Sequence, residues 1–93
     1  MQTEYRLVSW TLVYTPRTVR DAQKIKAAGL QTETQALLRR LQIDPSIGGR
    51  AVPLVGDLSG ACACRISFQH QLIYQVLQAR HTVKVIRLWT LAE

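Results

Sequence analysis

The last third of the chain constrains the fold most, because it contains three strand-like runs joined by very short links. The runs cover 61–68, 72–78 and 82–89, and they are rich in the β-branched and aromatic residues that favour strands. The links, Gln69–Gln71 and Ala79–His81, are short enough to require hairpins. We therefore predict three consecutive antiparallel strands in this part of the chain.

The first third supplies one more strand and a helix. Residues 4–14 have a strand-like composition. Thr15 and Pro16 then suit the N-cap and the first turn of a helix that ends at Gly29. The positions that repeat at helical spacing, and are therefore expected to face inward, are Val19, Ala22, Ile25 and Lys26.

A second helix begins after Gln31-Thr32 and stops at Asp44-Pro45. Its apolar stripe consists of Ala36, Leu37, Leu38 and Leu41. Residues 44–60 hold two of the three prolines and four of the five glycines, so we expect a loop with a short turn at 55–58. The order β-α-α-β-β-β predicts an α+β fold in a single domain, 1–93, with a helical hairpin on a twisted, mostly antiparallel four-stranded sheet.

The charge balance points to an acidic partner. The chain has 12 Lys plus Arg against 6 Asp plus Glu, a net charge of +6, and nine of the basic residues are arginines. A small arginine-rich domain typically binds nucleic acid or an acidic protein, although a plain solvated surface is the alternative. No apolar run approaches the roughly 20 residues that cross a bilayer. The N-terminus lacks the basic region of a signal peptide, so we expect a cytoplasmic protein.

Several stretches resemble one known family over nearly the whole chain. They are YRLVSWT and DAQKIKAAGL near the start, LVGDLSG at 54–60, RISFQHQLIYQV at 65–76 and TVKVIRLWT at 82–90. These are similar to the Txe/YoeB toxins of the RelE/ParE superfamily. The resemblance implies two helices packed on a twisted antiparallel sheet, and the toxin half of a type II toxin–antitoxin pair. Such toxins are mRNA interferases, endoribonucleases that cut mRNA in the ribosomal A site.

The resemblance also implies partners. The cognate antitoxin would carry an acidic, partly disordered C-terminal tail that folds onto the toxin. The ribosome and mRNA would meet the basic surface. A homodimer is left open, and neither a membrane, a metal nor a cofactor is expected.

The family's catalytic set is largely replaced in this chain. Metal-free RNA cleavage needs a base, an acid and cations that stabilise the phosphorane. Where the resemblance implies glutamate, arginine, histidine, tyrosine and a further arginine, the sequence has Val52, Gln71, Leu91, Ala92 and Cys64. The residual catalytic candidates are Arg65, Arg87 and His70. The candidates for nucleic-acid binding are Arg65, Arg87, Arg50, Arg39 and Arg40.

Each candidate has a plainer interpretation beside the functional one. Arg65 and Arg87, expected on neighbouring strands, either bind phosphate or are ordinary exposed residues. His70 is either a residual acid or base, or a hydrogen-bonding anchor of a hairpin turn. Trp10 and Trp89 are expected to pack at the core or its rim, with base stacking as the alternative. His81 is expected to be solvated in a polar turn.

The pair Cys62 and Cys64 could be a metal site, a disulfide or a replacement of former site residues. Cysteines one residue apart on a strand share a face, which strains a disulfide, and zinc needs about four ligands. Replacement is therefore favoured. A bulge near 61–64 would place Cys64 beside Arg65 in a former phosphate site, whereas regular alternation would turn both cysteines toward the helices.

These observations favour a Txe/YoeB-type toxin by descent, with RNA cleavage weak or lost. The alternative is a non-catalytic member of the fold that binds the antitoxin, the ribosome or itself. A third hypothesis, from another class, is a basic structural module unconnected with translation.

Overall fold

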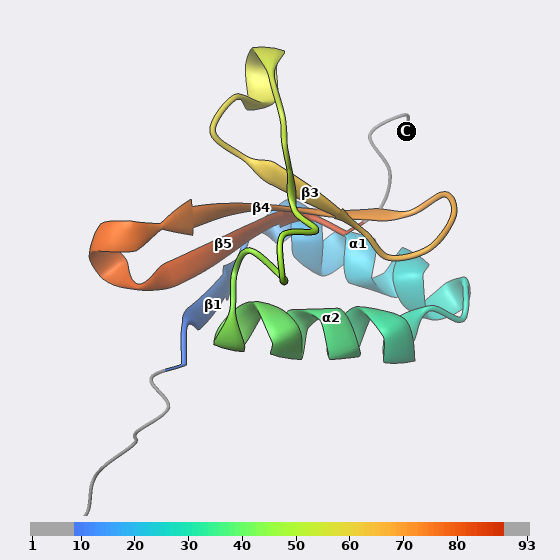
Figure 1. The fold of residues 1–93 in the computed structure, drawn as a ribbon. Coiled ribbons are helices and arrows are strands. Elements are labelled where there is room, and N and C mark those ends of the chain that lie inside the picture. The colour runs from blue at the N-terminus through green and yellow to red at the C-terminus, as the bar shows by residue number, and fades with distance from the viewer. Residues whose placement is uncertain (1–8, 89–93) are drawn as a thin grey trace, which may run out of the picture.

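The structure is a computed structural model that describes residues 9–88, and two helices lie against a twisted sheet (Figure 1). The strands and helices are β1 (Thr11–Tyr14), α1 (Pro16–Ala27), α2 (Gln31–Ile43), β2 (Val52–Pro53), β3 (Cys62–Arg65), β4 (Gln71–Leu77) and β5 (Thr82–Arg87). Two short 3-10 helices, η1 (Gly56–Leu58) and η2 (Gln78–Arg80), lie in the connections. The predicted α+β class and the helical hairpin are confirmed, as is the turn expected at 55–58.

The sheet has five strands in the order β1-β5-β4-β3-β2. The predicted antiparallel run of β3, β4 and β5 is confirmed, while β1 pairs in parallel with β5, Thr11 opposite Thr82. The prediction of four strands was wrong, because the two-residue β2 pairs with β3 and places Val52 opposite Ala63. A proline is tolerated at a sheet edge, so Pro53 misled the prediction toward a loop. The expected strand at 4–14 is confirmed only for Thr11–Tyr14, and 4–8 lie outside the described residues.

The start of α1 follows the predicted capping pattern. The Thr15 side chain accepts a hydrogen bond from the backbone N–H of Thr18 at 3.1 Å, and Pro16 occupies the first turn. This cap satisfies one of the amide groups that have no partner inside the helix. The helix therefore begins where the sequence predicts, immediately after β1.

The inward face of α1 differs from the prediction. Val19 and Ala22 are exposed, and the buried positions are Thr18, Asp21 and Ile25. These also repeat at three and four residues, so they form an equally regular stripe. Apolar periodicity does not assign polar residues to the inward face of a helix. Polar residues can nevertheless be buried when the sheet supplies hydrogen-bond partners.

The loop after α2 is held by its own hydrogen bonds. One Asp44 oxygen accepts from the Ser46 amide at 3.0 Å and the Ser46 hydroxyl at 2.7 Å, and the other accepts from the Gly48 amide at 2.9 Å. The hydrogen bond from the Ser46 hydroxyl has the largest effect, and together these bonds hold the pKa of Asp44 below its ordinary value. The Tyr74 hydroxyl donates to the Pro45 carbonyl, and Ile47 is 1% exposed. The loop is thus fastened to the core.

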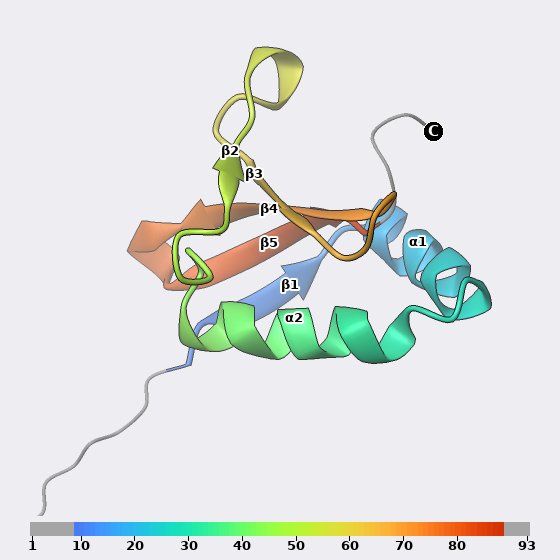
Figure 2. The same ribbon diagram turned by 45° about the vertical axis from the view of Figure 1, so that its right-hand side comes forward.

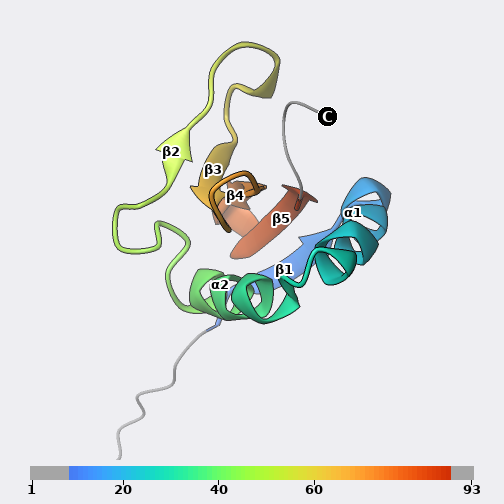
Figure 3. The ribbon, with the colours of Figure 1, turned by 90° about the vertical axis from the view of Figure 1, so that its right-hand side faces the viewer.

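The helices and the sheet enclose one core. Both helices lie on the same face of the sheet, and the arm that contains η1 extends away from them (Figures 2 and 3). The core between helices and sheet is built from Ile25, Leu37, Leu41, Ile47, Cys64, Leu72, Tyr74, Val83, Val85 and Leu88. A smaller cluster of Ala61, Ala63 and Ile73 is separate from it. Among the described residues no helix has the length and apolar character to cross a membrane.

The hairpin between β4 and β5 places His81 in an unexpected environment. His81 has a left-handed backbone, with φ of 50°, and its ring stacks on Trp10 with 3.9 Å between ring centroids. His81 is half-buried, so the expectation of a solvated residue was wrong. Trp10 packs against the core, as predicted, and Trp89 lies outside the described residues.

Candidate functional site

Arg65 stands at the end of β3 and is exposed. Together with Arg40 from α2 and Arg50 from the loop after α2, it lines a surface hollow of about 240 Å³. The remaining lining residues are Glu33, Ala36, Leu37 and Ile66. The fold therefore gathers three of the five arginines predicted to bind nucleic acid, from three separate elements.

The other two arginines lie elsewhere. Arg39, although next to Arg40 in sequence, lines a different hollow with Trp10 and Gln42. Arg87 is on β5, and β4 separates that strand from β3, so the expectation that Arg65 and Arg87 occupy neighbouring strands was wrong. The chain passes from β3 through β4 to β5, so two strand steps lie between the two arginines.

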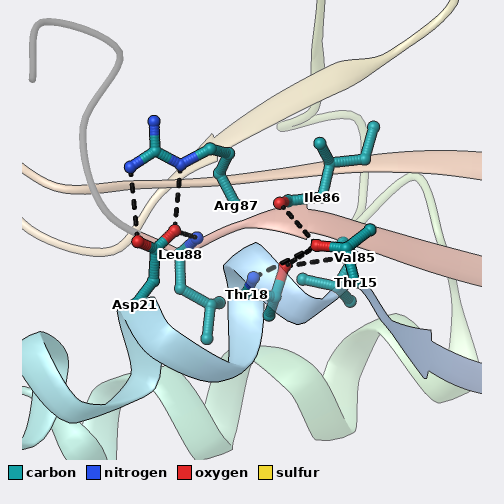
Figure 4. A network of polar contacts seen from close by, with 7 residues as sticks. All are labelled: Thr15, Thr18, Asp21, Val85, Ile86, Arg87 and Leu88. Atoms are coloured by element: carbon teal, nitrogen blue, oxygen red, sulfur yellow. Dashed lines mark hydrogen bonds and ion pairs between the residues drawn. The ribbon is translucent and has the colours of Figure 1, made fainter.

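The Arg87 guanidinium is held by Asp21 of α1 (Figure 4). Its Nε lies 2.9 Å from Oδ2 of Asp21, and a terminal nitrogen lies 3.3 Å from Oδ1. Oδ2 also accepts from the Leu88 amide at 3.2 Å. The side chains of Arg87 and Asp21 are only 14% and 2% exposed. A phosphate that used Arg87 would have to compete with a paired, mostly buried carboxylate.

Two threonines fix the geometry of this ion pair. Thr15 donates from its hydroxyl to the Ile86 carbonyl at 3.0 Å, and Thr18 donates to the Val85 carbonyl at 2.8 Å (Figure 4). These bonds hold the first turn of α1 against β5. Asp21 follows Thr18 by three residues and so projects from the same helix face toward Arg87.

The charged form of Asp21 is stabilised despite its burial. Burial is the largest single influence and disfavours the carboxylate. The hydrogen bonds from Arg87 and the Leu88 amide, with the charges of Arg87 and Arg17, outweigh it, so the pKa of Asp21 lies below its ordinary value. This residue was not predicted as a partner for Arg87, and its only sequence signal is a carboxylate in the stripe between Thr18 and Ile25.

His70 closes the turn between β3 and β4. Its Nδ1 lies 2.8 Å from the Ser67 hydroxyl, and its carbonyl accepts from the Ile66 amide at 2.7 Å. The interpretation of His70 as a turn anchor is therefore confirmed. One ring nitrogen is already engaged within the hairpin.

The cysteines follow regular alternation. Cys64 is 2% exposed in the core with Ile25 and Leu37, and the half-buried Cys62 packs against the same cluster. The bulged arrangement that would place Cys64 in a former phosphate site was wrong, because alternation turns its side chain toward the helices. Burial raises the pKa of the Cys64 thiol against the nearby charges of Arg50 and Arg40. Both cysteines are free thiols.

Two of the remaining replaced positions lie on strands. Val52 on β2 is 59% exposed, an apolar side chain without cover at a place where the resemblance implies an acid. Gln71 on β4 lies directly opposite Arg65 in the strand register. Leu91 and Ala92 lie outside the described residues.

Comparisons with known proteins identify similar folds. No protein-family model matches the chain, and no curated protein sequence is significantly similar. Among solved structures, the YoeB/ParE toxin from Agrobacterium tumefaciens superposes with a TM-score of 0.76 at 26% identity, over 86% of this chain and 96% of that one.

Two toxin–antitoxin complexes contain the same fold. The RelBE2 complex from Mycobacterium tuberculosis gives a TM-score of 0.72 at 23% identity, over 89% of this chain and 99% of the matched chain. The YoeB-YefM complex from Staphylococcus aureus gives 0.71 at 18% identity, over 86% and 94%. The similarity therefore spans almost the whole of each matched chain.

Proposed function

Since this chain is a YoeB/RelE-type member of the RelE/ParE superfamily by its fold, we propose that it is the toxin component of a type II toxin–antitoxin system. The observation that carries the proposal is the match to the YoeB/ParE toxin from Agrobacterium tumefaciens, which covers nearly all of both chains. Two further neighbours are chains of toxin–antitoxin complexes.

The proposed protein partner is an antitoxin with an acidic, partly disordered C-terminal tail. The net charge of +6 supports it, because a polyanionic segment gains favourable electrostatic energy on a basic surface. The same charge supports contact with the ribosome and mRNA. We place this role in the cytoplasm, and self-association remains part of the hypothesis.

We propose that RNA cleavage by this protein is weak or lost. Of the three residual candidates, Arg87 is paired with Asp21, His70 is engaged with Ser67, and only Arg65 is exposed. Losing a general acid or base, or one charge-stabilising donor, typically costs a factor on the order of 100 to 1,000 in rate. A lone arginine can bind a phosphate, but it supplies neither proton transfer.

The alternative function is binding without cleavage, to the antitoxin, the ribosome or a second copy. The three arginines at the hollow favour it, because they keep an exposed cationic surface although the positions implied for acid and base are replaced. In that case the protein would act by binding its target and not by cutting RNA.

Induced expression without an antitoxin is expected to leave bacterial growth almost unchanged, because the acid–base pair is absent. Growth curves after induction measure this, with mRNA ends mapped in the same cultures. The YoeB/ParE toxin from Agrobacterium tumefaciens, expressed from the same vector, serves as the comparison. Growth arrest accompanied by mRNA cut in the ribosomal A site would show that the protein is an active endoribonuclease.

A further inference from the structure

Residues of α2 form one wall of the hollow beside Arg65. Glu33, Ala36, Leu37 and Arg40 recur at three, four and seven residues, so they form one stripe along the helix. Leu37 is 6% exposed and belongs to the core, which fixes the rotation of α2 about its axis. Arg40 follows in the last turn and is therefore presented at the hollow by a packed helix.

The loop after α2 also lines the hollow, and hydrogen bonds hold its backbone. Arg50 donates its amide to the Ile47 carbonyl at 3.2 Å, and Ala51 donates to the Ser46 carbonyl at 3.3 Å. Asp44 caps the same loop, and Ile47 anchors it in the core. Binding at Arg50 would not have to order the backbone first, which removes one entropic cost of association.

The charges at the hollow are unbalanced. Three guanidinium groups face one carboxylate, Glu33. Within residues 9–88, Arg40, Arg50 and Arg65 have no side-chain hydrogen bond or ion pair, although the charge of Arg40 also acts on the Asp44 carboxylate. Like charges on separate elements repel, and the repulsion is relieved when an anion enters between them.

An exposed aromatic residue lies two positions after Ile66, which lines the hollow. Phe68 follows Arg65 by three residues, in the turn between β3 and β4, and it is 85% exposed. At this exposure, the ring gains little from burial when the chain folds alone. Nucleic-acid-binding surfaces combine cationic grooves with aromatic side chains on which bases stack. An acidic peptide would use the arginines but would have no specific need for this ring.

We propose that Arg40, Arg50 and Arg65 form a binding site for a phosphodiester group of single-stranded RNA, with Phe68 as a stacking platform for an adjacent base. Several planar guanidinium groups can surround one phosphate and bond its oxygens, whereas a carboxylate has two oxygens, which a single guanidinium can engage. Arg40, Arg50 and Phe68 are positions that the Txe/YoeB resemblance does not assign. The inference deepens the proposed contact with mRNA and rests on it for the identity of the natural ligand.

The test is the salt dependence of binding to a short, fluorescently labelled oligouridylate, followed by anisotropy. Arg40→Gln, Arg50→Gln and Arg65→Gln should each weaken binding and reduce the slope of log K against log salt by roughly 0.7 per lost contact. Arg80→Gln is the matched control, because Arg80 is exposed in η2 and away from the hollow, and it should leave the slope unchanged. Phe68→Ala should weaken binding about fivefold or more at unchanged slope.

Equal losses in the triad variants and in Arg80→Gln would mean diffuse charge attraction and would overturn the site. The same follows if a polyglutamate peptide binds as tightly as the RNA and depends on the same three arginines, since the site would then serve an acidic protein. Equal thermal midpoints of all variants establish that they are folded. Growth arrest on induction contradicts weak cleavage but leaves this site standing, whereas a failed salt test leaves the antitoxin partnership intact.

Discussion

Asp21→Asn is expected to lower the free energy of unfolding by about 3–5 kcal/mol, because it removes the carboxylate that pairs with the mostly buried Arg87 guanidinium. A small domain has a total stability of only about 5–15 kcal/mol, so this is a large share. The thermal midpoint should fall by more than about 12 °C at this chain length. Chemical denaturation followed by circular dichroism measures the change.

Two further variants separate the ion pair from the packing around it. Asp57→Asn removes an exposed carboxylate from η1 and should change stability by less than about 0.5 kcal/mol. The double variant Asp21→Asn with Arg87→Met should recover most of the loss, because it removes the buried charge as well and keeps a side-chain oxygen that can accept from the Leu88 amide. A loss below about 0.5 kcal/mol in Asp21→Asn would mean that Asp21 and Arg87 do not support the fold.

The same ion pair predicts instability in acid. The pKa of Asp21 is lower in the folded protein than its ordinary value of 3.8, so folding favours the charged form. The resulting stability is complete above the ordinary value and is lost as the pH falls through the lower folded-state pKa. Unfolding midpoints measured across the acid range should fall less steeply in Asp21→Asn than in the parent chain. Parallel profiles would exclude Asp21 as the titrating group.

Restoring the residues that the Txe/YoeB resemblance implies is expected to raise RNA cleavage on the order of a hundredfold or more. The changes are Val52→Glu, Gln71→Arg, Leu91→His and Ala92→Tyr, which supply acid, base and cation. Gln71 lies opposite Arg65, so an arginine there would add a second cation beside the first. Cleavage of mRNA on translating ribosomes is the measurement. A folded quadruple variant without any gain would refute the idea that these four positions limit activity.

Cys64→Arg does not belong in that set. Cys64 is 2% exposed between the helices and the sheet, and an arginine there would be a buried charge without a partner. We expect this variant to unfold, and we expect Cys64→Ala, which keeps the site apolar, to remain folded. A folded Cys64→Arg protein with increased cleavage would instead return Cys64 to the candidate site.

The elements that local chemistry specifies were predictable from the sequence. The antiparallel run of β3 to β5 followed from strand-like residues and short links, and the Thr15 cap followed from hydroxyl chemistry at a helix start. What failed depended on partners distant in the sequence. The burial of Asp21 requires Arg87, and the short strand β2 requires the edge of β3.

In the candidate site, too, the residue types were predictable from the sequence, but their arrangement was not. The sequence indicated that arginines would bind an anion, yet Arg39 and Arg40 are adjacent and only Arg40 reaches the hollow. The rotation of α2 decides between them, and the burial of Leu37 and Leu41 fixes that rotation. Arg50 joins the site because of the fold of its loop, which glycine and proline content alone does not specify.

The parallel pairing of β1 with β5 has a consequence for synthesis. The Thr15 hydroxyl bonds the Ile86 carbonyl 71 residues later, and Arg87 bonds Asp21 across 66 residues. Contacts between such distant segments form slowly, because long loops must close first. A nascent chain thus contains α1 before the synthesis of β5, the strand to which Thr15 and Thr18 bond. Until β5 has been made, β1 also lacks the strand with which it pairs, so the first and the last described strand must both be present before the sheet can form.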